Sequence, residues 1–110
     1  MIYVMNSAVM PAGNYGTYAY SPATVEDLAA VLRGEHGEWQ SCIGYAQNCD
    51  LIERWTGVRP PMNRVETRFV NGDRALILRL KYRVDPTRKG APVSDDPGDW
   101  EFAWVEYRAS

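Results

Sequence analysis

Residues 39–57 read WQSCIGYAQNCDLIERWTG and predict a short strand, a glycine turn and a helix. The strand is expected over Trp39–Ile43, a short run that stops at Gly44. The helix is expected over Gln47–Thr56, where apolar residues share one stripe and Gly57 stands at the usual C-terminal cap position. A glycine before a helix start also lets backbone N–H groups approach an anion.

The residues before this stretch predict two strands and a helix. Ile2–Met10 is mostly apolar and is typical of a buried first strand. Tyr15–Tyr20 alternates aromatic residues and predicts a second, short strand. Ser21 and Pro22 then offer an N-cap and a proline at the first helical position, and apolar residues recur at helical spacing up to Gly34.

The C-terminal half predicts a hairpin and a last strand. Asn71-Gly72 is a strong signal for a two-residue hairpin turn between residues 64–70 and 73–83. That register makes Arg64 face Arg79 and predicts one polar face, made of Arg64, Glu66, Arg68, Arg79, Lys81 and Arg83. The like charges are either offset by Glu66 and solvent, or they mark a site for an anion such as phosphate. Residues 85–99 predict a loop, and 100–107 a last, aromatic-rich strand.

Composition and charge bound the class of protein. The chain has 110 residues, of which 45% are hydrophobic and 24% charged, as expected of one globular domain over residues 1–110. The order of elements predicts an α/β fold, or else α+β, with a mixed sheet of about five strands flanked by helices. The formal net charge of -2 argues against DNA and anionic membranes as partners. No apolar run approaches the ~18 residues of a membrane helix.

No metal or other cofactor is expected. Cys42 and Cys49 lack a CxxC spacing, and the single histidine, His36, lies between two glycines in a predicted turn. The cysteines are expected to be reduced thiols, which predicts a cytoplasmic protein, in the host cell if the protein is viral.

A second candidate site, after the predicted basic face, is the stretch from Ser41 to Tyr45. It either ends an ordinary strand or cradles a phosphate. In the second case Gly44 gives access to the backbone, and Tyr45 presents a phenol or stacks on a base.

Several stretches in the same order together resemble the viral type III anti-CRISPR ring-nuclease family. They are residues 1–8 (MIYVMNSA), 41–45 (SCIGY), 56–58 (TGV), 63–66 (NRVE) and 72–76 (GDRAL), which leads into a strand that ends at Tyr82-Arg83. The resemblance covers roughly residues 1–83. It implies an intertwined homodimer of mixed α/β subunits, which binds a cyclic oligoadenylate in a pocket across the dimer interface. The aromatic-rich last strand also favours a dimer.

The resemblance, together with the patterns above, predicts the ligand-binding residues. These are Asn6, Ser7, Ala8, Ser41, Ile43, Gly44, Tyr45, Asn63, Arg64 and Arg83. Characterised members cleave the ring with a histidine directly after the Ile-Gly pair, where this sequence has Tyr45. A neutral phenol with an ordinary pKa of ~10 is a poor general acid. If the protein is an enzyme, Tyr45 and Arg83 are its candidate catalytic residues.

Because Tyr45 stands where the family has its histidine, three functions are considered. The protein binds and sequesters a cyclic nucleotide signal, or it is a metal-independent ring nuclease that acts by positioning the substrate, or it is a protein-binding inhibitor on the same fold. The first is favoured, because the predicted basic face and cradle remain while the proton donor is missing. The ligand is a cyclic oligoadenylate, a cyclic dinucleotide or a cyclic ADP-ribose derivative.

Overall fold

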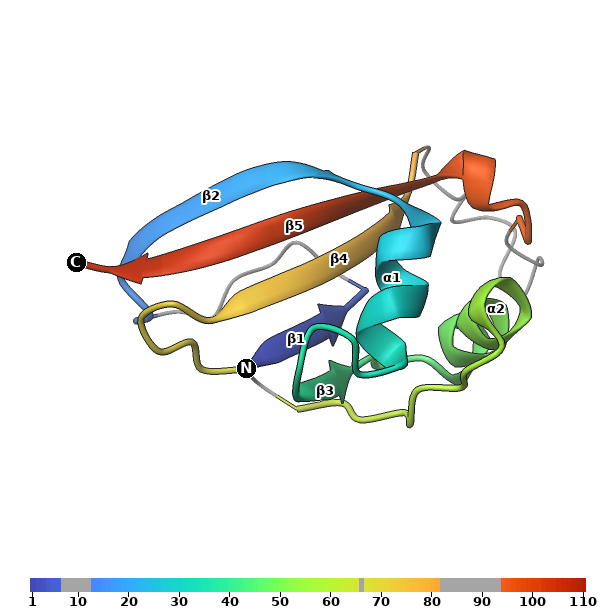
Figure 1. Cartoon of the computed structure of the whole chain (residues 1–110), viewed down its shortest axis with the longest axis horizontal. Helices are drawn as coiled ribbons and strands as arrows, with labels where there is room; N and C mark the ends of the chain where they lie inside the picture. The colour runs from blue at the N-terminus through green and yellow to red at the C-terminus, as the bar shows by residue number, and fades with distance from the viewer. Residues whose placement is uncertain (7–12, 66, 82–93) are drawn as a thin grey trace, which may run out of the picture.

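The computed structural model describes residues 1–6, 13–65, 67–81 and 94–110 (Figure 1). The strands are β1 (Ile2–Met5), β2 (Gly16–Ala23), β3 (Trp39–Cys42), β4 (Arg74–Leu80) and β5 (Trp100–Ala109). The helices are α1 (Val25–Leu32) and α2 (Ala46–Thr56), and Pro97–Asp99 form a short 3-10 turn, η1.

The strands form one mixed sheet in the order β2-β5-β4-β1-β3. β1 pairs in parallel with both β3 and β4, whereas β5 pairs antiparallel with β4 and β2. The expected α/β fold with a mixed sheet of about five strands is therefore confirmed.

Both helices lie over the same face of the sheet, and the larger core fills the space between the helices and that face. The strands contribute alternate residues to it, because side chains on a strand point to the two faces in turn. Its buried members are Ile2, Val4, Leu28, Val31, Leu32, Ile43, Cys49, Leu51, Ile52, Leu76, Leu78 and Trp100. The aromatic residues of β5 that face the helices, Phe102 and Trp104 among them, pack against this core. Their packing within one chain removes the argument for a dimer that rested on them.

A second, smaller core lies on the opposite face of the sheet. It is built around Phe69, which comes from an irregular segment and not from a strand. The ring of Phe69 meets those of Tyr3 and Tyr18 edge-on, with centroids 5.4 and 5.9 Å apart. Aromatic pairs in this arrangement add ~0.5–1.5 kcal/mol beyond the area that they bury.

The predicted hairpin is wrong, although its turn exists. The amide of Asp73 donates to the carbonyl of Val70 over 2.9 Å, and Gly72 adopts a φ of 90°. Residues 64–70 form no strand in the part that the structure describes, because β4 is already paired with β1 on one side and β5 on the other. Arg79 consequently lies opposite Glu101, with Nε 2.8 Å from Oε2, and not opposite Arg64. The predicted basic face therefore does not form as expected, and two of its members, Glu66 and Arg83, lie outside the described residues.

Two element boundaries also differ from the prediction. The first strand ends at Met5, and residues 7–10 lie outside the described part of the chain. The second strand runs through Ser21 and Pro22, and the first helix starts after Thr24 instead. Thr24 is the N-cap because it forms a capping box with Asp27. Its hydroxyl accepts from the backbone amide of Asp27 over 3.1 Å, and the Asp27 carboxylate accepts from the backbone amide of Thr24 over 2.9 Å.

The remaining elements lie close to where the sequence predicts them. The second helix spans Ala46–Thr56 and ends at Gly57 with a φ of 80°. The last strand continues to Ala109, two residues beyond the prediction. Of the predicted loop over residues 85–99, the structure describes 94–99, which include η1.

The carboxylate of Asp73 holds the turn before β4. Asp73 is only 5% exposed, its Oδ2 accepts from the amide of Val70 over 2.8 Å, and its Oδ1 lies 3.3 Å from the amine of Met1. An Asp73→Ala variant leaves that amide without its acceptor, so we expect ~1–3 kcal/mol less free energy of unfolding in a urea titration. Asp73→Asn keeps an acceptor oxygen and should lose less. Equal losses in both variants would contradict this role.

Candidate functional site

Seven of the ten predicted ligand-binding residues are described, and they gather where β1 and β3 end. Met5 is in register with Cys42, so Asn6 and Ile43 follow two parallel strands at the same level. The carboxyl ends of parallel strands are the usual place for a ligand in an open α/β sheet. Ser7, Ala8 and Arg83 lie outside the described residues.

A short segment after α2 runs alongside the end of β3 and completes this edge. The hydroxyl of Ser41 donates to the carbonyl of Pro61 over 2.5 Å. Asn63 donates two hydrogen bonds. Its backbone N–H donates to the carbonyl of Ile43 over 2.8 Å, and its side-chain Nδ2 donates to the carbonyl of Ser41 over 2.9 Å. Ser41 and Ile43 are buried, so these two predicted ligand residues position the segment and offer no exposed side chain.

This segment brings Arg64 against Gly44 and Tyr45. The guanidinium carbon of Arg64 lies 5.0 Å from the centroid of the Tyr45 ring. A β-carbon at residue 44 would lie 3.3 Å from Nε of Arg64, a tight contact that glycine avoids. Gly44 thus admits the arginine side chain, and the cation–π contact contributes ~0.5–1 kcal/mol at an exposed position.

The start of α2 adds positive potential beside Arg64. Tyr45 is the N-cap residue, but its side chain makes no capping hydrogen bond, and the first turn holds no acidic residue. The positive end of the helix dipole is therefore not offset locally. Within the described ranges no carboxylate forms an ion pair with Arg64, so two sources of positive potential meet at one point.

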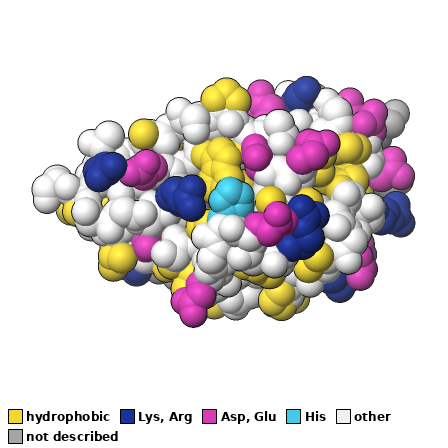
Figure 2. Space-filling model, viewed as in Figure 1, with side chains coloured by type: hydrophobic (Ala, Val, Ile, Leu, Met, Phe, Trp, Pro, Cys, Tyr) yellow, Lys and Arg dark blue, Asp and Glu magenta, His cyan; other side chains and the backbone are white. Residues whose placement is uncertain are grey.

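Charge elsewhere on the molecule is mixed. On the face seen in Figure 2, Lys and Arg side chains are scattered among Asp and Glu. Among the described residues, most of the exposed arginines have carboxylate partners, such as Arg33 with Glu35 and Arg59 with Asp50. The positive potential at Tyr45 and Arg64 is therefore a local feature of a surface whose charge is otherwise mixed.

The single histidine and the two cysteines are not placed to act as an acid or a nucleophile at this site. His36 packs edge-on against Trp104, with ring centroids 5.5 Å apart, and is not at the start of α2. Burial raises the pKa of the Cys42 thiol, although its hydrogen bond with Thr67 lowers it, and burial also raises the pKa of Cys49. Both thiols therefore stay protonated at neutral pH, where a thiolate would be needed for nucleophilic attack.

The described part of the chain contains no cluster of three or more residues that could hold a metal ion. The same residues include no helix that is long and apolar enough to cross a membrane.

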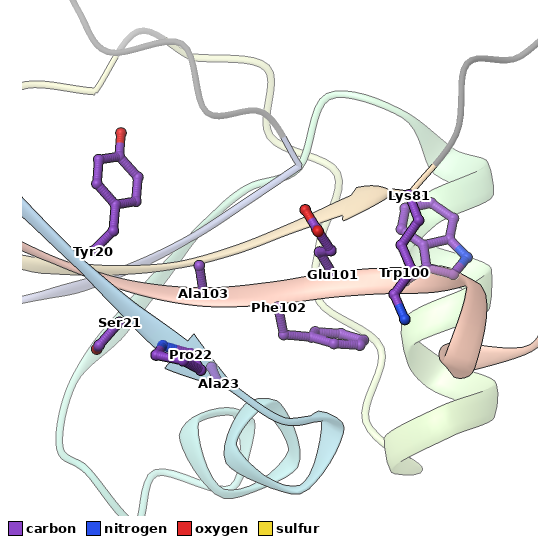
Figure 3. A pocket seen from close by; sticks show the side chains of 9 residues that line it. All are labelled: Tyr20, Ser21, Pro22, Ala23, Lys81, Trp100, Glu101, Phe102 and Ala103. Carbon is purple, nitrogen blue, oxygen red and sulfur yellow. The ribbon is translucent and has the colours of Figure 1, made fainter.

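A groove of about 490 Å³ lies farther along the same sheet edge, where β2 ends and β5 begins (Figure 3). Tyr20, Glu101 and Ala103 point to one side of the sheet and Phe102 to the other. Lys81, directly after β4, supplies a cation to the groove. The sequence pattern does not predict this groove, because it places Lys81 on the polar face of a hairpin that does not form. β4 and β1 separate the groove from Arg64.

Comparison with known proteins places the chain in a family. A family model for STIV B116-like proteins matches residues 2–96. The chain belongs to the STIV B116-like family. ORF117 of Acidianus two-tailed virus is 24% identical over 85 residues, which cover 76% of this chain and 73% of that protein. Protein 26 of Sulfolobus islandicus filamentous virus is 28% identical over 87 residues, which cover 77% and 72%.

A solved structure agrees with the fold. B116 of Sulfolobus turreted icosahedral virus matches with a TM-score of 0.71 at 24% sequence identity, over 96% of this chain and 98% of that one. All three relatives are proteins of viruses. The expected membership of a family of small viral proteins is therefore confirmed.

The hydrogen bonds of Asn63 should control how firmly the Arg64 segment is held. In Asn63→Ala the bond to the Ser41 carbonyl is lost, so we expect the free energy of unfolding to fall by ~1 kcal/mol. Hydrogen exchange followed by mass spectrometry should be faster in peptides that cover residues 61–64. Gln47→Ala, an exposed change on the first turn of α2, is the control. Unchanged exchange at 61–64 in Asn63→Ala would show that other contacts hold the segment.

Proposed function

We propose that the protein binds and sequesters a cyclic nucleotide signal of host antiviral defence at the carboxyl edge of β1 and β3. The observation that carries the proposal is the guanidinium of Arg64 on the ring of Tyr45, beside Gly44 and the uncapped start of α2. The resemblance of the sequence to the anti-CRISPR ring-nuclease family supports the nature of the ligand.

The chemistry of these groups suits a nucleotide in two ways. A planar guanidinium can donate two parallel hydrogen bonds to a phosphate, and helix-start amides can donate further ones. Tyr45, which is 59% exposed, offers a flat apolar surface on which an adenine can stack. Cyclic oligoadenylates, cyclic dinucleotides and cyclic ADP-ribose derivatives all combine phosphate with a flat nucleobase, and the proposal covers these three classes.

A second copy of the chain is part of the proposal. Tyr45 and Arg64 are exposed at one edge of the molecule, so a single copy surrounds a ring-shaped ligand on one side only. Two copies related by a twofold axis would present two equivalent Arg64 side chains to a ligand that itself has repeated phosphates. This arrangement predicts one ligand for two chains.

Sequestration without cleavage fits the residue at position 45. A tyrosine in place of the family's histidine leaves the site without a side chain that exchanges a proton readily at neutral pH. Neither His36, which contacts Trp104, nor the protonated cysteines replace it. The protein would then oppose host defence by holding the signal, and it would need no metal ion or other cofactor.

Removing the Arg64 cation should weaken binding. In Arg64→Ala we expect at least a tenfold rise in the dissociation constant, because a charge-assisted contact contributes ~1.5–3 kcal/mol. A thermal-shift panel of the three nucleotide classes identifies the best ligand, and titration calorimetry then gives its affinity and stoichiometry. Arg33→Ala removes an exposed arginine that pairs with Glu35, and it should bind as the unmodified protein does.

Equal affinity in the Arg64→Ala and unmodified proteins would refute the site. If no nucleotide raises the melting temperature, the protein-binding inhibitor becomes the better hypothesis. Loss of binding in Arg83→Ala would extend the site to a residue that the resemblance assigns.

Tyr45 decides between sequestration and cleavage. After long incubation at equal concentrations of sites and ligand, chromatography of the denatured mixture should recover the nucleotide intact. Tyr45→Phe should change the affinity only through one hydrogen bond, ~1 kcal/mol or about fivefold, and yield no new product. Tyr45→His introduces a group with an ordinary pKa of ~6.5 and should cleave a cyclic oligoadenylate slowly if that ring is the ligand. Conversion to linear products by the unmodified protein, lost in Tyr45→Phe, would instead identify a ring nuclease.

A further inference from the structure

The groove beside Lys81 exists because β2 ends before the sheet does. The last residue of β2, Ala23, lies opposite Phe102, and the chain then turns away into α1. β5 begins two residues before Phe102, at Trp100, and these first residues are in register with β4 but not with β2. β2 is therefore absent from this end of the sheet, and the groove of about 490 Å³ lies there (Figure 3). Small-molecule sites commonly have a volume of this size.

Aromatic and small apolar side chains form much of the groove. The apolar residues among those that line it are Pro22, Ala23, Trp100, Phe102 and Ala103. The ring of Trp55, on α2, packs edge-on against those of Phe102 and Trp100, with centroids 5.8 and 5.5 Å apart. The indole N–H of Trp100 donates to the carbonyl of Ser94 over 3.0 Å, so this donor is already satisfied. The aromatic wall is held in place by these contacts, and a ligand would not have to order it.

Lys81 supplies the groove with a cation. Its backbone N–H donates to the carbonyl of Asp99 over 3.0 Å, which fixes the base of the side chain beside the groove. Figure 3 shows its ammonium on the Phe102 side of β5 and the Glu101 carboxylate on the other side. Glu101 is already paired with Arg79, with Nε 2.8 Å from Oε2. Among the residues that the structure describes, no carboxylate forms an ion pair with Lys81, so its ammonium is available to an anion.

We propose that this groove binds a small organic acid, with its carboxylate on the ammonium of Lys81 and its apolar body against the ring of Phe102. A charge alone would gain little from an exposed lysine, because water competes for both partners. The apolar lining adds a contribution that grows with the apolar area removed from water. A phosphate group suits the groove less, since it is best bound by several donors, and Lys81 is the single cation among the described lining residues. The ligand class is therefore one carboxylate joined to an apolar chain or ring.

This groove is separate from the proposed nucleotide site. β4 and β1 lie between β5 and β3 in the sheet, and Arg64 lies beside Gly44, beyond the end of β3. The lining residues all come from β2, β5 and the residue after β4. The inference rests on these residues and not on the proposed function.

Phenylbutyrate and phenylbutanol are a matched pair of probes, because they share a ring and a chain but only the first carries a charge. In a titration followed by proton–nitrogen NMR, both should shift the indole N–H signal of Trp100 and the backbone amides of Ala23 and Phe102, and the shifts should saturate. The indole signal of Trp39, on β3 at the other end of the sheet, should not move. We expect the acid to bind at least about threefold more tightly than the alcohol, as a contact with an exposed charge allows.

Variants at Lys81 test the position of the carboxylate. Lys81→Gln removes the cation, so it should abolish the difference between the acid and the alcohol and leave the affinity for the alcohol unchanged. Lys81→Arg is the matched control, because it keeps a cation and should keep the preference for the acid. Arg64→Ala should bind both probes as the unmodified protein does.

The proposal would be overturned if the groove signals showed no saturable shift, or if the unmodified protein bound the acid and the alcohol equally. A preference for the acid that persists in Lys81→Gln would also overturn it, because the carboxylate would then lie elsewhere. Loss of acid binding in Arg64→Ala would place the acid at the proposed nucleotide site instead. The probes contain no phosphate or nucleobase, so either proposal can fail while the other stands.

Discussion

The whole arrangement depends on β1, four residues that are paired on both sides. Ile2 lies in register with Trp39 of β3 and with Arg74 of β4, and all three strands run in the same direction. Side chains of β1 are buried on both faces of the sheet, Val4 under the helices and Met5 in the second core. A strand in this position must satisfy its backbone on both edges. It therefore draws β3 and β4 together from segments far apart in the sequence.

Parallel pairing with β1 in turn decides where the candidate site forms. Parallel strands end at the same edge of a sheet, so Asn6 and the Gly44 turn come to one level. The connection from β3 to β4 must then cross the sheet, and α2 lies in that connection. The start of α2, with its unneutralised dipole, is placed directly after the end of β3.

The pairing of β4 has a second consequence for the segment before it. Since β1 and β5 occupy both edges of β4, residues 61–64 find other partners for their backbone groups. The Ser41 hydroxyl donates to the carbonyl of Pro61, and the Ile43 carbonyl accepts from the backbone amide of Asn63, both alongside β3. Arg64 therefore lies at the ring of Tyr45 and not in the expected hairpin.

The sequence by itself determined the features that depend on near neighbours. The apolar stripe and Gly57 placed α2, the Asn71-Gly72 pair placed a turn, and Gly44 marked the boundary between strand and helix. Helical stripes and turns reflect contacts within a few residues, so they can be read locally. The start of α1 shows the limit of such local prediction. Ser21 and Thr24 are both possible N-caps, and the capping box of Thr24 decided between them.

Only the tertiary structure decided which strands pair and what surrounds Arg64. An alternating pattern shows that a segment such as β4 has two faces, but it does not name the neighbour on each edge. The Asn71-Gly72 turn favoured a hairpin locally, and the buried, doubly paired β1 outweighed it through contacts more than 70 residues apart in sequence. The contact between Arg64 and Tyr45 follows from that choice, because it needs β3, α2 and residues 61–64 in place at once.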